Sequence, residues 1–190
     1  MQQDTESSER AKYEETWRMA HYRQVCHGLQ VWKDYRHLFP RRPRSGLDIG
    51  SGTGRLVMQW KQEHIDAWGI DIASNAADQD AQPFTIQGNL WDPNLWVGPE
   101  RASFSMGCCA DVMEHIPPDR VLDVLKNNHK VCEVVVYKIA NFPSVFQGRR
   151  LHLTLRPRHW WLEQLEIFGA VKEDLGRFGI EEYIFKVTSR

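Results

Sequence analysis

Hydrophobic positions along the chain follow a helical period first and then alternate between strand and helix patterns. From Tyr13 to Phe39, apolar and aromatic residues recur every three or four positions, which predicts one or two amphipathic helices. Pro40 and Pro43 end this region, because proline cannot continue a helix. Residues 1–10 are polar, and we expect them to form a frayed tail.

After residue 44, short apolar runs alternate with helical patterns. The predicted strands are GLDIG, AWGIDI, FTIQGNL, ASFSMGCCADV, CEVVVYKIAN and two further runs within 171–190. Helical segments between most of these runs indicate right-handed βαβ crossovers and a mostly parallel sheet covered on both faces. The last two runs are close enough to form a hairpin, so the sheet is expected to end with an antiparallel strand. We therefore predict a Rossmann-like α/β fold with a seven-stranded sheet at 45–190 and an N-terminal helical extension, a lid over the acceptor pocket, at 1–44.

Composition and charge exclude several classes of protein. The 190 residues carry a net charge of -1, which argues against a general attraction to nucleic acid or anionic lipid. No apolar run approaches the roughly 20 residues that cross a bilayer, and the polar N-terminus lacks an apolar signal core. The cysteines include adjacent Cys108 and Cys109 and no CxxC pair, which indicates free thiols and a cytoplasmic location.

A glycine-rich turn follows the first predicted strand. The segment LDIGSGTGRL places Gly50, Gly52 and Gly54 between that strand and a helix. This arrangement is typical of sites for nucleotide-like ligands, because glycine lets a ligand approach the main chain. The spacing differs from both G-x-G-x-x-G and the phosphate-binding loop. The turn alone therefore fits a ligand site or a tightly packed left-handed turn.

Two acids and an amide stand where such a ligand would lie. Asp48 directly precedes the turn, where a carboxylate repels phosphate and suits an ammonium group. Asp71 ends the second strand, the position that contacts ribose hydroxyls in folds of this type. Asn89 follows the third strand, with an amide able to hydrogen-bond a base edge, and Leu90 can pack on the base. These residues favour a nucleoside-containing ligand with positive charge.

The segments LDIGSGTG, WGIDIA, IQGNL and CCADVMEHIP together resemble the class I S-adenosylmethionine-dependent methyltransferases, from about Ser45 to the C-terminus. The resemblance implies S-adenosyl-L-methionine as cofactor. It also implies a set of cofactor-binding residues, namely Asp48, Gly50, Gly52, Gly54, Asp71, Ile72, Asn89, Leu90 and Asp111. In that set, Asp71 contacts the ribose, Ile72 packs on adenine, and Asp111 lines the floor beneath the methyl group. Many members have Asp where this chain has Asn89.

A second group of residues gathers carboxylates and imidazoles. The segment ADVMEHIP places Asp111, Glu114 and His115 at the open end of the predicted sheet, and His152 follows in RRLHLTL. Such a set suits either a divalent metal ion or general acid–base chemistry on an acceptor hydroxyl. Both interpretations remain open at this point.

The D-x-x-E-H run with a distant histidine is similar to two metal-using groups, the ubiquinone-pathway O-methyltransferases and the small-RNA 3′-terminal 2′-O-methyltransferases. That resemblance implies Mg, Mn or Zn held by Asp111, Glu114, His115 and His152. Those families have Glu where this chain has Asp111, which shortens one ligand arm. In many other class I methyltransferases the same EHIP run binds no metal.

We therefore expect a methyltransferase (EC 2.1.1) that moves a methyl group to an oxygen or nitrogen of a small soluble acceptor. His115, helped by Asp111 or His152, is the expected base. One alternative is metal-assisted methylation of a ribose hydroxyl in a nucleotide or RNA, although the chain carries no recognizable nucleic-acid-binding domain. Another is a non-catalytic cofactor-binding subunit of a partner. The acceptor is expected to be anionic if two arginine clusters, 41–44 and 149–150, both flank the site.

Overall fold

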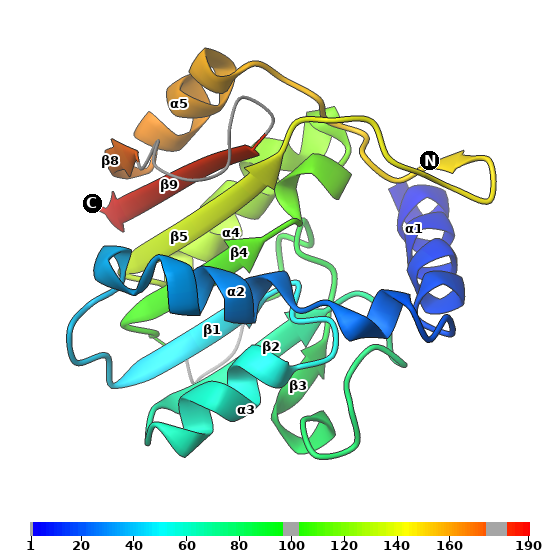
Figure 1. Ribbon diagram of the computed structural model, residues 1–190. Helices are drawn as coiled ribbons and strands as arrows, with labels where there is room; N and C mark the ends of the chain where they lie inside the picture. The colour runs from blue at the N-terminus through cyan, green and yellow to red at the C-terminus, as the bar shows by residue number, and fades with distance from the viewer. Residues whose placement is uncertain (1, 97–102, 174–181) are drawn as a thin grey trace.

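The computed structural model describes residues 2–96, 103–173 and 182–190. Within them, the core is a seven-stranded sheet in the order β3-β2-β1-β4-β5-β9-β8 (Figure 1). The strands are β1 (Ser45–Ile49), β2 (Asp66–Asp71), β3 (Thr85–Gln87), β4 (Met106–Ala110), β5 (Val134–Ala140), β8 (Gly169–Glu173) and β9 (Glu182–Ser189). Strands β1 to β5 run parallel, and β9 runs antiparallel to both β5 and β8. The predicted Rossmann-like fold with an antiparallel last strand is confirmed.

The strand order creates a switch point at the centre of the sheet. Strand β1 pairs with β2 on one side and with β4 on the other. Connections therefore leave this point in opposite directions, which opens a crevice at the carboxyl ends of β1 and β4.

Helices cover the sheet on both faces, and adjacent residues of a strand point to opposite layers. Cys108 packs in one cluster with residues of α2 (His27–Asp34) and α3 (Arg55–Gln62). Cys109 packs in the other cluster with residues of α4 (Val121–Val131) and α5 (Arg158–Glu166). Figure 1 shows α2 and α3 in front of the sheet and α4 behind it. Both cysteines are free and buried, and burial raises the pKa of their thiols, so they act as core residues.

The N-terminal region corrects one expectation. Helix α1 (Gln2–Thr16) begins where a frayed tail was expected, and a 3-10 turn (Tyr22–Gln24) connects it toward α2. The contacts of α1 include polar ones to distant loops, such as the hydrogen bond from Asn89 to Glu6, and hydrophobic periodicity does not reveal these. Helix α2 lies in the core, where the Trp32 ring meets that of Trp60 at 5.5 Å.

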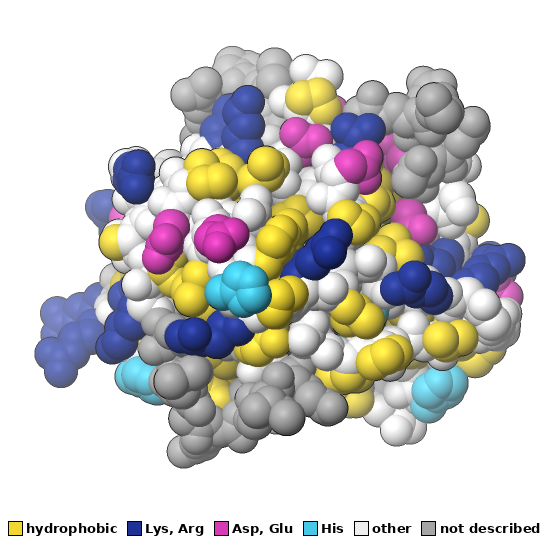
Figure 2. All heavy atoms as spheres, turned by 90° about the horizontal axis from the view of Figure 1, so that it is seen from above, with side chains coloured by type: hydrophobic (Ala, Val, Ile, Leu, Met, Phe, Trp, Pro, Cys, Tyr) yellow, Lys and Arg dark blue, Asp and Glu magenta, His cyan; other side chains and the backbone are white. Residues whose placement is uncertain are grey.

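A short ribbon of β6 (Val145–Phe146) and β7 (Arg149–Arg150) lies beside α1 and was not predicted. Its turn has positive φ at Gln147 and Gly148, which suits a tight hairpin. Lys and Arg side chains lie singly or in small groups among Asp and Glu on the face shown in Figure 2. No helix among the described residues is long and apolar enough to cross a membrane.

Candidate functional site

A cavity of about 440 Å³ opens at the carboxyl ends of the central strands. Three acids at the ends of β1, β2 and β4 line it, namely Asp48, Asp71 and Asp111. Tyr13 and Trp17 of the N-terminal region form the facing wall. Most of the residues expected to bind the cofactor line this cavity, and they are Asp48, Gly50, Gly52, Asp71, Ile72, Leu90 and Asp111. Gly54 and Asn89 directly follow or precede the lining residues Thr53 and Leu90.

The glycine turn has a backbone conformation that other residues rarely adopt. Gly50, Gly52 and Gly54 have φ of +71°, +50° and +74°. A Cβ atom at Gly50 would lie 2.3 Å from the side chain of Val112, and one at Gly52 would lie 2.7 Å from the Trp17 ring. The chain's own packing therefore demands glycine at these positions, while the turn still forms part of the cavity wall.

Two buried carboxylates flank this turn. Asp71 accepts hydrogen bonds from the backbone N–H groups of Gly52 and Ala73, both at 2.9 Å. Burial raises the pKa of Asp71, and burial together with the nearby Asp71 charge raises the pKa of Asp48 to about 8. A cationic ligand between them would favour the ionised forms. The donor set is compatible with a cofactor that places positive charge near Asp48 and hydroxyl groups near Asp71.

Asp111 is held in an unusual position by its neighbours. Its φ is +53°, in the left-handed region, and its backbone N–H donates to the carbonyl of Lys138 at 2.9 Å. Its carboxylate pairs with Lys138 Nζ at 2.8 Å and with His27 Nδ1 at 2.7 Å. Burial opposes ionisation, but the His27 hydrogen bond and the Lys138 charge outweigh it and lower the pKa of Asp111 to about 2. Asp111 therefore lines the cavity as an ionised carboxylate.

The sequence did not point to His27, Lys138 and Glu182, which surround the Asp111 carboxylate directly or through Lys138. Lys138 is 2% exposed and also pairs with Glu182 at 2.9 Å. A lysine within the apolar run VVVYKIA was a usable signal, because a lysine in a buried strand needs partners.

Glu114, His115 and His152 form a cluster in which one ligand atom of each residue lies within 4.8 Å of the others. Glu114 and His115 belong to a 3-10 turn, Met113–His115, after β4. The segment that follows His152 is fastened to this turn, because the N–H groups of Leu153 and Thr154 donate to the Glu114 carbonyl at 2.7 and 2.9 Å. Asp111 lies outside the cluster, since Lys138 and His27 hold its carboxylate.

Backbone contacts fix both imidazoles of this cluster. His115 Nδ1 donates to the Leu151 carbonyl at 3.0 Å, and His152 Nδ1 donates to the Phe142 carbonyl at 2.6 Å. A carbonyl oxygen only accepts, so each Nδ1 carries the hydrogen and each Nε2 keeps its lone pair. Glu114 Oε2 is buried without a hydrogen-bond partner among the described residues, while Oε1 accepts from the Ala140 N–H at 3.2 Å.

Burial keeps both histidines of the cluster neutral. Burial, followed by the neighbouring His152, lowers the pKa of His115 to about 3, and burial also lowers the pKa of His152. Burial, followed by the Asp111 charge, raises the pKa of Glu114. Neutral imidazoles beside a buried acid suit either a hydrogen-bonded acceptor or a divalent cation.

Several solved structures are similar to this chain over most of its length. A TehB-like S-adenosylmethionine-dependent methyltransferase from Corynebacterium glutamicum is similar over 97% of this chain and 100% of its own, with a TM-score of 0.66 and 21% identity. One from Archaeoglobus fulgidus is similar over 93% and 98%, with a TM-score of 0.63 and 18% identity. Magnesium protoporphyrin IX methyltransferase from Synechocystis, solved with bound S-adenosylhomocysteine, is similar over 89% of this chain and 83% of its own, with a TM-score of 0.59 and 16% identity. The chain has the class I methyltransferase fold. No protein-family model and no curated protein matches its sequence.

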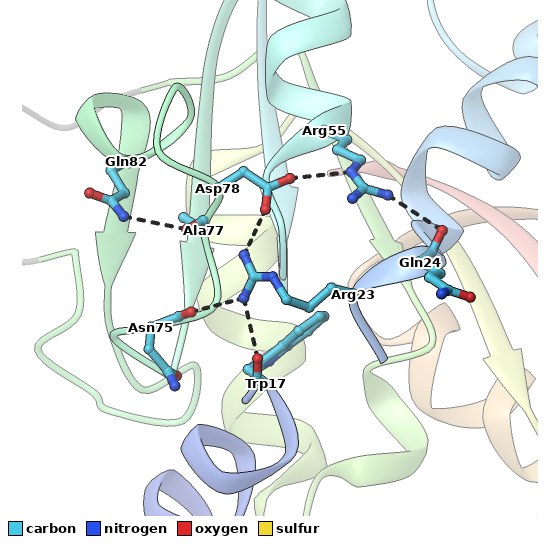
Figure 3. Close-up of polar contacts among 8 residues, drawn as sticks. All are labelled: Trp17, Arg23, Gln24, Arg55, Asn75, Ala77, Asp78 and Gln82. Atoms are coloured by element: carbon cyan, nitrogen blue, oxygen red, sulfur yellow. Dashed lines mark hydrogen bonds and ion pairs between the residues drawn. The ribbon is translucent and has the colours of Figure 1, made fainter. Parts of the chain in front are cut away.

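In this methyltransferase fold, the N-terminal region is tied to the loop after β2 by arginine contacts (Figure 3). Arg23 pairs with Asp78 at 2.6 Å and donates to the carbonyls of Asn75 and Trp17 at 3.1 and 3.3 Å. Arg55 of α3 pairs with the same Asp78 at 3.2 Å. These contacts hold Trp17 over Gly52. One helical turn earlier, Tyr13 meets the His115 ring edge-on at 5.6 Å.

The two arginine clusters lie in different parts of the molecule. Arg41, Arg42 and Arg44 precede β1 and therefore lie at the amino end of the sheet, opposite the cavity. Arg149 and Arg150 form β7, where Arg149 pairs with Glu15 of α1 at 3.5 Å. The condition that both clusters flank the site is not met, so the arginines give an anionic acceptor little support.

Proposed function

We propose that the chain is an S-adenosylmethionine-dependent methyltransferase that acts on an oxygen or nitrogen of a small acceptor. The observation that carries this proposal is the pair of buried carboxylates, Asp48 and Asp71, on either side of a glycine turn at the switch-point cavity. Buried acids with raised pKa values cost folding stability unless a ligand compensates them, and they are common at functional sites. Their position at the ends of β1 and β2 supports the proposal that the cavity binds the cofactor expected from the sequence.

Residues at the ends of different strands would each bind a different part of the cofactor. Asp48 and the glycine turn would hold the methionine portion, Asp71 the ribose hydroxyls, and Ile72 and Leu90 the adenine faces. When bound, S-adenosylmethionine supplies a methyl group already activated by the positive sulfur. The protein therefore needs mainly to align an acceptor and exclude water, which Tyr13 and Trp17 support from the opposite wall.

His115 is proposed to receive the acceptor. Its Nε2 lone pair is available, because Nδ1 is bound to the Leu151 carbonyl, and it can accept a hydrogen bond from a hydroxyl or amine. His152 stands against it with ring centroids 4.7 Å apart. Asp111 places a fixed negative charge nearby, as its pairing with Lys138 keeps it ionised.

Methyl-labelled S-adenosylmethionine and a panel of neutral phenols, amines, carboxylic acids and nucleotides test the proposal. We expect wild-type protein, without any second protein, to transfer label to one acceptor class. The Asp71→Ala variant should transfer none. Transfer that requires a second protein would instead support the non-catalytic subunit. A folded chain that binds no S-adenosylmethionine and transfers no label refutes the proposal.

A second candidate function is metal-assisted O-methylation, and the Glu114–His115–His152 cluster favours it. Three protein ligands would leave coordination positions open for acceptor oxygens such as those of a ribose, and the backbone already orients both imidazoles. A divalent ion in this cluster would supply a Lewis acid for an acceptor hydroxyl. The buried, unpartnered Glu114 oxygen is the atom that a cation would satisfy.

Metal content after dialysis against Mg, Mn or Zn salts tests this second candidate without any acceptor. We expect about one ion per chain in wild type and a loss in Glu114→Gln and in His152→Ala. Asp111→Asn is the matched control, because its carboxylate lies outside the cluster, and it should retain the ion. Absence of bound metal, together with label transfer that a chelator leaves unchanged, would rule out this candidate.

A further inference from the structure

The side chain of Asn89 offers an adenine a neutral amide in place of a carboxylate. Asn89 is buried just after β3, next to Leu90 in the cavity wall. Its Oδ1 already accepts from the Trp91 N–H at 3.1 Å, which leaves this neutral oxygen one lone pair, and its Nδ2 is a donor. The exocyclic amine of adenine is a donor as well. Asn89 alone would therefore offer that amine one neutral acceptor that is already engaged.

A carboxylate from the N-terminal helix stands at this position instead. Asn89 Nδ2 donates to Glu6 Oε2 at 2.9 Å, across 83 positions of sequence. Arg10 fixes the other oxygen, Oε1, at 2.7 Å. The Glu6 side chain remains 33% exposed, and a carboxylate offers about four lone-pair sites, so it can accept a further hydrogen bond.

Helix α1 presents the same face along the cavity. Glu9 and Tyr13 follow Glu6 by three and seven positions, which places all three on one side of the helix. Glu9 and Tyr13 line the cavity, and Tyr13 reaches His115 at its acceptor end. Figure 1 shows α1 standing beyond the ends of the central strands. Glu6 therefore extends this wall toward β3, where a base would lie beyond the ribose that Asp71 contacts.

We infer that Glu6 belongs to the cofactor site and that its carboxylate, held by Asn89 and Arg10, accepts a hydrogen bond from the exocyclic amine of adenine. This inference rests on the proposed function, because it requires the adenine to lie beside Asn89 and Leu90. It makes the N-terminal helix a determinant of base identity. A base with an oxygen in place of the amine would meet the negative charge of Glu6 and be rejected.

Titration calorimetry with two nucleosides tests the inference. The probes are S-adenosylhomocysteine and S-inosylhomocysteine, in which an oxygen replaces the exocyclic amine. We expect wild type to prefer the adenine form at least tenfold, because one charge-assisted hydrogen bond is worth about that factor. Glu6→Ala should bind the adenine form about tenfold more weakly. The ratio of its affinities for the adenine and inosine forms should fall toward one, because the freed Asn89 amide can donate to the inosine oxygen.

Two further variants separate recognition of the base from docking of the helix. Glu6→Gln retains an acceptor oxygen without charge and should keep part of the preference. Glu14→Ala is the matched control, since it removes another polar contact of α1, the 2.9 Å hydrogen bond from Ser74. It should leave the ratio between the two nucleosides unchanged.

The possible outcomes are distinct. An unchanged ratio in Glu6→Ala, or a gain in affinity for both nucleosides, overturns the role of Glu6 and leaves the methyltransferase proposal in place. A wild-type chain that binds neither nucleoside, while circular dichroism shows it folded, overturns both.

Discussion

The two ends of the central sheet differ in whether their buried polar groups have hydrogen-bond partners. From the middle of β5, Tyr137 donates to His129 Nε2 at 3.0 Å toward the amino end of the strand, and His129 Nδ1 donates to Ser189 Oγ at 2.8 Å. Ser189 Oγ in turn donates to the Cys132 carbonyl at 2.7 Å, which completes the chain. Burial lowers the pKa of His129 to about 4, so this network is neutral.

The carboxyl end keeps polar groups that the chain itself does not satisfy. Asp48 and Glu114 are buried with raised pKa values, and Glu114 Oε2 and the Tyr13 hydroxyl lack hydrogen-bond partners among the described residues. Asp111 adds a left-handed backbone conformation. Buried groups of this kind destabilise a fold, and they persist where a ligand interacts with them. Indole N–H groups such as Trp60 Nε1 also lack partners among the described residues, but the buried acids with raised pKa values gather at the carboxyl end, which indicates that this end is built for binding.

The largest expected effect is on binding at the carboxyl end. Asp71→Ala should lower affinity for S-adenosylhomocysteine about 100-fold, because the ribose hydroxyls lose a charged acceptor worth roughly 1.5–3 kcal/mol per hydrogen bond. The free energy of unfolding should change by only about 1 kcal/mol. Loss of the hydrogen bonds from Gly52 and Ala73 is offset by removal of a buried charge. Calorimetry and urea denaturation measure the two quantities, and a threefold or smaller loss of affinity would contradict the assignment.

A matched pair of Tyr→Phe changes compares the two ends directly. Tyr137→Phe removes the donor to His129 and should cost about 1–2 kcal/mol of unfolding free energy. Tyr13→Phe removes a buried hydroxyl that has no hydrogen-bond partner among the described residues, so stability should stay within about 0.5 kcal/mol or rise. Urea denaturation of both variants without ligand measures this. Equal losses would show that the ends do not differ in this way.

The smallest expected effect is the release of a proton from Asp48 when the cationic ligand binds. The pKa of Asp48 is raised to about 8 in the folded chain, so the folded state holds a proton that the unfolded state has released between about pH 4 and pH 8. The contribution of Asp48 to stability is therefore present at low pH and is lost as pH rises through 8. A cationic ligand favours the carboxylate and should release close to one proton at about pH 7.

Calorimetry of S-adenosylmethionine binding in buffers with different ionisation enthalpies counts that proton. Asp48→Asn is the control, because its amide does not titrate, and it should release none. The assignment of Asp48 fails if the variant and the wild type release the same number of protons.

Sequence pattern predicted the sheet well because its strands carry local signals. Alternation of apolar runs and helices gave the parallel core, and the short spacing of the last two runs gave the antiparallel hairpin. The place of Asp48 and Asp71 in the cavity wall was predictable because both acids stand at strand ends, where position along the chain fixes position in space.

Contacts between distant residues were the part that sequence did not reveal. The Glu6–Asn89 hydrogen bond joins positions 83 apart. Residues 1–10 were expected to fray because the sequence does not reveal the polar contacts that dock α1. Asp111 was grouped with Glu114 and His115 by proximity in sequence. Its left-handed φ and the charge of Lys138 instead place its carboxylate outside their cluster.

Calorimetric titration of S-adenosylmethionine into the purified wild-type chain tests the central claim most directly. The claim is that a cationic nucleoside completes the carboxyl-end cavity, and it predicts saturable binding of one ligand per chain with a Kd of about 1–100 μM. A folded chain that shows no binding at roughly millimolar ligand would contradict it.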